Sequence, residues 1–343
     1  MKRDLLVIKF GTASITLPNG EPDVYILEEI ARQVAELHKT YRVVLVSSGA
    51  VGAGKRFIRN YEGQISQKKA AAAIGNPLLL KMYDEAFSRY GITVAQSLLE
   101  RQHFAQRSQF LQLKETYEEL WRNYIIPIAN ENDVVSNREL KFSDNDELAT
   151  LIASGFGARL MMLCTASGGL LDKEGQLLHE VPEIDETVLS YVNKSGSALG
   201  SGGMASKLTF THLANKMGIR VVIFGMKEAD GILNAYNGRA GTTFIPRPKN
   251  LKARTKWLAS GGVSVGKIVV DDGAAAAVRD RKSLLMVGIK EHEGGFTKGE
   301  LVEIVTESGE TIGVGKVRVS ATALAEETGR STIIIHTNDL VLL

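Results

Sequence analysis

The sequence contains a single cysteine, Cys164, among 343 residues. One cysteine excludes both a disulfide framework and a thiolate metal cluster, and its scarcity fits a reducing compartment. Long apolar runs are also absent, and no segment approaches the ~20 apolar residues of a membrane-spanning helix. Near the first residue, two basic residues precede an apolar run of only four, which is too short for a signal peptide. We therefore expect a cytoplasmic protein with no membrane partner.

An excess of charge is missing as well. Lys and Arg total 41 and Asp and Glu total 39, a net charge of +2. Proteins that bind nucleic acid or an acidic membrane over a broad face usually carry a clear positive excess. The histidines have no spacing typical of metal ligands, so they indicate no metal site. They are His38, His103, His179, His212, His292 and His336.

What the chain does contain is a series of apolar, β-branched runs separated by amphipathic stretches. The runs that predict strands are 5–10, 43–48, 125–130, 160–165 and 221–225. The stretches that predict helices include 24–41, 113–124 and 204–218. Strands that alternate with helices indicate an α/β fold, with a mostly parallel sheet sandwiched by helices. We expect this domain to span residues 1–250.

The composition changes after this first region. Residues 245–258 are polar and include two prolines, so we predict a linker, placed at 251–264. Short β-type runs follow, most of them separated by glycine-containing turns, which is typical of a small β-rich barrel. We expect this second, smaller domain at 265–343.

Polar or glycine-rich residues follow each of the first four predicted strands, and a similar segment opens the helix near residue 204. In open parallel sheets, ligands bind beyond the carboxyl ends of the strands. We therefore expect these segments to surround one crevice. The segments are 9–14, 47–50, 130–133 together with 143–146, 165–169, and 200–207.

The residue types in these segments suit phosphoryl transfer. Glycine-rich turns and a helix N-terminus present backbone N–H groups to anions. Lys9 and Lys207 stand beside two such turns, and positive charge there would stabilise a phosphoryl group in transfer. Asp146 would hold the lysines in place. Asp133 and Asn145 would bind an ammonium group or another polar group of the acceptor.

Each of these features also has a simpler structural interpretation. A lysine at a strand end is often a solvated edge residue, and 200–203 reads equally well as a loop before a helix. The Asn and Asp residues of 130–133 and 143–146 favour turns and caps, and Asp146 suits the first turn of a helix. Cys164 lies inside an apolar run and is interpreted as a small buried hydrophobic residue.

Residues 49–55 form one ambiguous pattern. They read G-A-V-G-A-G-K, a Walker A sequence, except that Arg56 stands where a Ser or Thr would contact Mg²⁺. The segment is therefore either a phosphate-binding loop or a glycine turn of another kind.

Five motifs, in this order and spacing, resemble those of the glutamate 5-kinases of the amino acid kinase family. They are KFGTAS (9–14), VSSGAVGAG (46–54), NENDVVS (130–136), SDNDELA (143–149) and GSGGMASKL (200–208). The resemblance covers nearly the whole chain, because the segment from Gly266 is similar to the PUA domain that many members carry. It implies that the turn in 46–54 lies near the acceptor and the transferred phosphoryl group and is not a Walker A loop.

The resemblance implies ATP-dependent phosphorylation of the side-chain carboxylate of L-glutamate, giving L-glutamyl 5-phosphate, the first step towards proline. It also implies ATP with Mg²⁺ as MgATP, a homo-oligomer (dimer or tetramer) and feedback inhibition by proline. Two other functions stay open. One is a related kinase that acts on aspartate, an N-acetylated amino acid or UMP, against which the paired NEND and SDND motifs argue. The other is a PUA-type RNA-binding protein with an inactive kinase fold, against which the retained lysines argue.

The resemblance also assigns roles residue by residue. Its catalytic positions match Lys9, Lys207 and Asp146. Its glutamate-binding positions match Ser48, Gly49, Ala50, Asp133 and Asn145. Its ATP-binding positions match Lys9, Gly11, Thr165, Ala166, Ser201, Gly202, Gly203, Met204 and Lys207. The family usually has an aspartate where Ala166 stands, so the resemblance says less about nucleotide preference than about the reaction.

The predicted second domain is acidic. From Gly266 to Leu343 it carries nine Lys and Arg against twelve Asp and Glu, a net charge of −3. RNA binding needs a basic face or aromatic side chains for base stacking, and Phe296 is the only Phe, Tyr or Trp of this stretch. We therefore predict that this domain stabilises or regulates the kinase and does not bind RNA with useful affinity.

Overall fold

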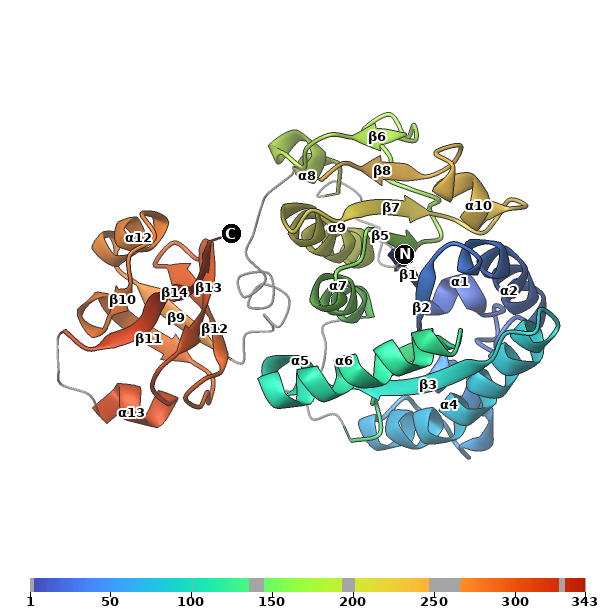
Figure 1. Cartoon of the computed structure of the whole chain (residues 1–343), viewed down its shortest axis with the longest axis horizontal. Coiled ribbons are helices and arrows are strands. Elements are labelled where there is room, and N and C mark those ends of the chain that lie inside the picture. Colours follow the sequence, from blue (N-terminus) through green and yellow to red (C-terminus); the bar gives the residue numbers. More distant parts are fainter. Residues whose placement is uncertain are drawn as a thin grey trace. The chain divides into compact units, whose positions relative to one another are not determined.

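The computed structural model describes residues 3–100, 102–135, 145–192, 201–246, 266–326 and 331–342. The chain forms two compact units, one from 1–100 with 113–249 and the other from 101–112 with 250–343. Each unit contains a sheet and a hydrophobic core of its own (Figure 1). The predicted linker, 251–264, lies outside the described residues, so the predicted domain limits stay predictions.

The first unit is built on an eight-stranded sheet in the order β3-β4-β2-β1-β5-β7-β8-β6. Paired neighbours are parallel except β7 and β8, which are antiparallel. The predicted, mostly parallel sheet is therefore confirmed. The strands are β1 Leu5–Phe10, β2 Arg42–Ser47, β3 Val94–Leu99, β4 Ile126–Glu131, β5 Leu160–Cys164, β6 Glu180–Val181, β7 Arg220–Phe224 and β8 Thr242–Phe244.

Strand β1 is the point where the strand order changes direction. Its register pairs it with β2 on one side and with β5 on the other, and all six of its residues are buried. Ligands of open α/β sheets bind beyond the carboxyl ends of the strands at such a point. The carboxyl end of β1 is therefore the place where this fold favours a site.

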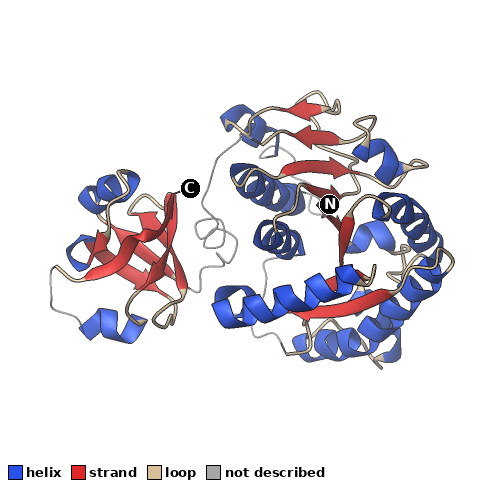
Figure 2. Cartoon of the chain, viewed as in Figure 1, coloured by secondary structure: helices blue, strands red, loops and turns tan. Residues whose placement is uncertain are grey.

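Helices cover both faces of this sheet (Figures 1 and 2). Apolar side chains of α2, α4 and α10 form one core with Leu6, Ile8 and Phe10 of β1. Helices α7 and α9 pack against each other and against β1, β5 and β7. The helices of the first unit are α1 Thr12–Ile15, α2 Val24–His38, α3 Ala50–Gly54, η1 Lys55–Phe57, α4 Ile65–Ser88, α7 Asn145–Phe156, α8 Glu186–Val192, α9 Ser201–Lys216 and α10 Gly231–Tyr236. Helix α5 Gln102–Ala105 belongs to the second unit, and the division between the units falls within α6 Arg107–Arg122.

Helices that have an N-cap and a distinct apolar face are also the ones whose helical pattern is clearest in the sequence. Helix α2 begins after Asp23, whose side chain accepts hydrogen bonds from the backbone N–H groups of Tyr25 and Ile26, as an N-cap should. Helix α4 was not predicted, because the alanine run 70–73 and Pro77 obscure a helical pattern. Within the described part of the chain, no helix is long and apolar enough to cross a bilayer.

The second unit contains a six-stranded sheet in the order β10-β14-β13-β12-β9-β11. Its pairs are antiparallel except β12 and β9, which are parallel. The predicted small β-rich domain is therefore confirmed. The elements are β9 Lys267–Val270, α12 Asp272–Arg279, β10 Leu284–Leu285, η2 Met286–Gly288, β11 Ile289–Glu293, β12 Leu301–Thr306, β13 Thr311–Val317, α13 Ala321–Glu326 and β14 Ile333–Leu342.

Candidate active site

Two lysines and one aspartate meet at the carboxyl end of β1. The Nζ atom of Lys9 lies 2.7 Å from Oδ1 of Asp146, and the Nζ atom of Lys207 lies 2.9 Å from Oδ2 of the same carboxylate. The three side chains are buried, with 6% of Lys9, 11% of Lys207 and 1% of Asp146 exposed. The structure thus brings together the residues for which a catalytic role was predicted. The role itself stays a prediction.

Three separate elements place these side chains. Lys9 is near the end of β1, and Asp146 is in the first turn of α7, where the helix dipole favours a negative charge. Lys207 is in the second turn of α9. Because α7 and α9 pack on each other and on strands beside β1, the three side chains converge although they are far apart in the sequence.

The cluster holds more positive than negative charge. A buried charge costs free energy unless a partner offsets the loss of water. Here two ammonium groups share one carboxylate, so these three side chains together carry a surplus of one positive charge. Such a preorganised, poorly hydrated surplus stabilises an anion, and most strongly one whose negative charge grows during a reaction.

A cavity of about 600 Å³ opens beside this cluster, in the usual size range of small-molecule sites. Its walls come from the turn after β1, the end of β5, the segment that follows β5, and the start of α9. Its lining residues are Gly11, Thr12, Ala13, Ser14, Cys164, Thr165, Ala166, Ser167, Gly169, Leu170, Leu171, Asp172, Lys173, Gly175, Tyr191, Gly203, Met204 and Lys207.

Most residues predicted to bind ATP line this cavity. They are Gly11, Thr165, Ala166, Gly203, Met204 and Lys207. Lys9 is not part of the lining, but a Cβ atom added to Gly11 would lie 3.6 Å from the Lys9 ammonium nitrogen, so the two are neighbours. Ser201 and Gly202 are the first two residues of α9.

Next to Asp146 in the chain, Asn145 is in contact with Ser48. The Nδ2 atom of Asn145 donates to Oγ of Ser48 at 2.7 Å and to Oδ1 of Asn130 at 3.1 Å. Asn130 in turn donates from Nδ2 to Oδ1 of Asn76 at 3.1 Å. Of the predicted acceptor-binding residues, the structure thus joins Ser48 and Asn145. Asp133 lies in the turn that follows β4.

Asn76 is the member of this network for which the sequence patterns predicted no role. It lies in the middle of α4 and is only 6% exposed. One signal was available, since an Asn–Pro pair within an alanine-rich helix is locally unfavourable, and such breaks of local preference often mark functional sites.

The glycines of 49–55 allow two helices to pack closely. Gly49 has φ of 103°, which a side chain would strain, and it begins the short helix α3. A Cβ atom on Gly54 would lie 1.9 Å from the carbonyl oxygen of Ala71, and one on Gly75 would lie 1.7 Å from that of Ala50. Helices α3 and α4 therefore touch backbone to backbone, which explains the Walker-like glycines.

Cys164 is buried at the end of β5 and contributes to the cavity wall. Burial raises the pKa of its thiol to about 11, although a hydrogen bond with Ser14 acts in the opposite direction. The thiol is therefore neutral near pH 7, and its interpretation as a small buried residue agrees with its place in the structure.

Comparison with known proteins gives two family matches. The model of the amino acid kinase family matches residues 4–225, and that of the PUA domain matches residues 266–337. A glutamate 5-kinase of Aliivibrio fischeri is 34% identical over 362 residues, covering 98% of each chain. A glutamate 5-kinase of Oleidesulfovibrio alaskensis is 37% identical over 338 residues, covering 95% of this chain and 89% of its own.

Solved structures share the fold of the first unit. Carbamate kinase from Giardia lamblia bound to AMP-PNP is 18% identical, with a TM-score of 0.50, over 71% of this chain and 99% of that one. A second structure of Giardia carbamate kinase has 19% identity and a TM-score of 0.51, over 71% of this chain and 99% of that one. At this identity, the likeness supports the fold alone.

Proposed function

The chain belongs to the amino acid kinase family, and from that premise we propose that it transfers the γ-phosphoryl group of ATP to the side-chain carboxylate of L-glutamate, giving L-glutamyl 5-phosphate and ADP. The observation that carries this proposal is the buried cluster of Lys9, Asp146 and Lys207, whose Lys207 lines a 600 Å³ cavity and whose Asp146 follows Asn145 of a network of amide side chains. The likeness to glutamate 5-kinases along nearly the full chain supports glutamate as the acceptor.

The lysines act on the charge of the transferred group. A carboxylate oxygen of glutamate attacks the γ-phosphorus while the bond to the bridging oxygen of ADP breaks, and negative charge spreads over the oxygens of the phosphoryl group. The ammonium groups of Lys9 and Lys207 stabilise this charge. Asp146 positions both lysines. It is not needed as a general base, because the attacking carboxylate carries no proton at neutral pH.

The amide network serves recognition of the acceptor. Both N–H groups of the Asn145 side chain are used by Ser48 and Asn130, so its Oδ1 atom, which is buried and has no partner, is left to accept from the α-ammonium group of glutamate. Asp133 supplies a carboxylate for the same group. The Ser48 hydroxyl accepts from Asn145 and keeps its own hydrogen for a carboxylate oxygen of the acceptor.

ATP enters as MgATP. Among the described residues, no three His, Cys, Asp or Glu side chains gather to hold a metal ion, and the carboxylate of Asp146 is engaged by two lysines. Mg²⁺ in kinases is held largely by the phosphates of the nucleotide, so this donor set fits an ion that arrives with ATP. We further propose a cytoplasmic homo-oligomer that takes the first step towards proline and is inhibited by proline.

The test is ADP release from MgATP with L-glutamate, with hydroxylamine present to trap the labile acyl phosphate as a hydroxamate. Stoichiometric ADP and hydroxamate are expected, and the reaction should slow when proline is added. A panel with L-aspartate, N-acetyl-L-glutamate and UMP provides the comparison. Faster turnover with any of these than with L-glutamate would assign the chain to another acceptor.

A further inference from the structure

Four polar side chains from four separate elements form a chain of hydrogen bonds that runs from the acceptor side into the core. They are Ser48 after β2, Asn145 of α7, Asn130 of β4 and Asn76 of α4, joined by contacts of 2.7, 3.1 and 3.1 Å. Asn76 and Asn130 are each 6% exposed. Two amides placed so deeply need a physical reason, because a buried amide costs free energy unless its hydrogen bonds are made.

The direction of this chain is set by a backbone group. The backbone N–H of Glu131 donates to the Asn130 side chain at 2.9 Å, and a backbone N–H can only donate. The atom of Asn130 that it meets must therefore be Oδ1. The same oxygen accepts from Asn145, so Asn145 must present its Nδ2 atom there.

The remaining atoms of the chain then follow. Asn130 turns its Nδ2 atom to Asn76, which must accept with Oδ1. Two buried atoms are left without a hydrogen-bond partner, Oδ1 of Asn145 at one end and Nδ2 of Asn76 at the other. Every amide is thus oriented by the next, and at the end next to Ser48 the atom left to accept is the carbonyl oxygen of Asn145.

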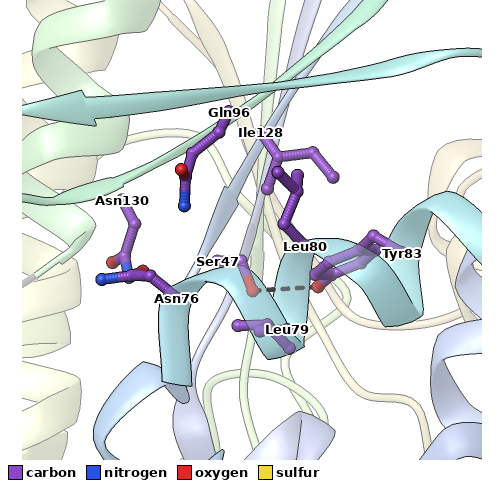
Figure 3. Close-up of a pocket in the computed structure, with 8 residues that line it drawn as sticks. All are labelled: Ser47, Asn76, Leu79, Leu80, Tyr83, Gln96, Ile128 and Asn130. Atoms are coloured by element: carbon purple, nitrogen blue, oxygen red, sulfur yellow. Dashed lines mark hydrogen bonds between the residues drawn. The ribbon is translucent and has the colours of Figure 1, made fainter. Parts of the chain in front are cut away.

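Asn76 is held firmly in its position. The preceding residue, Gly75, touches the carbonyl oxygen of Ala50, so α4 cannot move relative to the turn that carries Ser48 without breaking a backbone contact. Figure 3 shows the side chains of Asn76 and Asn130 next to each other at the edge of a small cavity. That cavity is about 10 Å³, about enough for one water molecule, and Gln96 and the hydrogen-bonded pair of Ser47 and Tyr83 also line it.

We propose that Asn76 is a positioning residue for recognition of the acceptor's ammonium group. It accepts from Asn130 and so keeps Asn130 in the one orientation that uses both N–H groups of Asn145 and leaves the carbonyl oxygen of Asn145 turned to the acceptor. Without this acceptor, the Nδ2 atom of Asn130 is buried and unpaired, and Asn130 rotates away to find another partner. Asn145 then loses its fixed orientation. The inference rests on the proposed function, because it concerns the glutamate side of the same site.

The test compares Asn76→Leu, which has the same branching but is larger and cannot accept, with Leu80→Ala as a matched control on the same helix. Leu80 lines the same small cavity and has no part in the chain of hydrogen bonds. Two quantities are measured, the KM values for L-glutamate and ATP, and the inhibition constant of glutarate, which is glutamate without its ammonium group. Asn76→Leu should raise the KM for glutamate about tenfold and leave the KM for ATP within about twofold. The preference for glutamate over glutarate should fall by a similar factor, and Leu80→Ala should keep it.

Asn76→Asp is the conservative variant. It keeps the oxygen that accepts from Asn130 and replaces only the nitrogen that has no partner, so it should retain the preference for glutamate over glutarate. If Asn76→Leu does not fold, Asn76→Ser takes its place, since its hydroxyl is too short to reach Asn130. An unchanged preference in the Leu or Ser variant would overturn the proposal, and so would equal losses in the Asp and Leu variants. Wild-type protein that does not phosphorylate glutamate would instead overturn the proposed function.

Discussion

Two ion pairs of equal length, one in each unit, show how strongly burial changes the electrostatic effect of a pair of charges. Lys9 and Asp146 lie 2.7 Å apart in the first unit, with side chains 6% and 1% exposed. Arg279 and Glu310 also lie 2.7 Å apart in the second unit, but with side chains 51% and 62% exposed. The exposed pair is screened by water and ions and contributes about 0–1 kcal/mol. The buried pair lies in a poorly hydrated environment, where its electric field is strong. Such a field can stabilise charge that develops during a reaction.

The same contrast extends to the units as wholes. The first unit buries lysines, carboxylates and amides among its strands and helices. The core cluster of the second unit is apolar, with residues such as Ile268, Val302 and Phe296, and its described residues bury few polar side chains, among them Thr306 and Asp339. Polar groups are buried at a cost in stability, so a fold keeps them where they are used. We therefore expect the chemistry in the first unit and a supporting role for the second.

Lys9→Ala and Lys207→Ala should each lower kcat by about 10²-fold or more, the size expected when one positioned electrostatic group is lost. Each variant should still fold, because the other lysine continues to neutralise Asp146. Steady-state kinetics and a thermal melt check both points. Arg279→Ala is the matched control and should keep both kcat and stability, the latter within about 0.5 kcal/mol. Near-normal turnover in either lysine variant would remove that lysine from the mechanism.

Asp133→Ala and Asn145→Ala should raise the KM for glutamate about tenfold or more, because each removes a partner of a charged group. The KM for ATP should change far less. If proline occupies the acceptor pocket, its inhibition constant should rise in the same variants. Equal increases for both substrates would mean that these residues organise the whole site, and undiminished inhibition would place proline elsewhere.

Discrimination between ATP and GTP should be loose, below about tenfold in kcat/KM. Ala166 is exposed in the cavity and offers no carboxylate to a base, and a pocket without a specific hydrogen bond separates similar ligands only weakly. Ala166→Asp should widen the difference between the two nucleotides. A strict preference for ATP in the wild-type protein would show that other groups read the base.

The second unit should show no useful affinity for RNA. Its acidic balance and its single aromatic residue among Phe, Tyr and Trp oppose both phosphate contacts and base stacking. A mobility-shift titration of the full chain at physiological salt checks this. Arg279→Ala and Arg281→Ala serve as variants that each remove one positive charge near residue 280. Saturable, salt-sensitive binding in the low micromolar range or tighter, weakened by these variants, would contradict the division of roles between the two units.

Some of the site could be predicted because its residues lie in short, ordered motifs next to recognisable strands. Lys9 follows an apolar β-branched run, and Lys207 follows the glycines at the start of a helix, so local pattern alone placed both near the edge of a parallel sheet. Asn76 could not be found in this way. It lies inside α4, whose helical pattern is obscured by an alanine run and a proline. Its partner Asn130 is 54 residues away in the sequence.

The sequence predicts the central strands, the clearly amphipathic helices, the acidic character of the second unit, and the residue types available at the strand ends. Periodicity, caps and charge are short-range properties, so they can be read along the chain. Three features depend on tertiary packing. One carboxylate holds two lysines, α3 and α4 meet through Gly54 and Gly75, and the hydrogen bonds between three amides fix their orientation. These contacts depend on how separate elements pack to within an ångström or less, and hydrogen bonds and backbone contacts are sensitive to that distance.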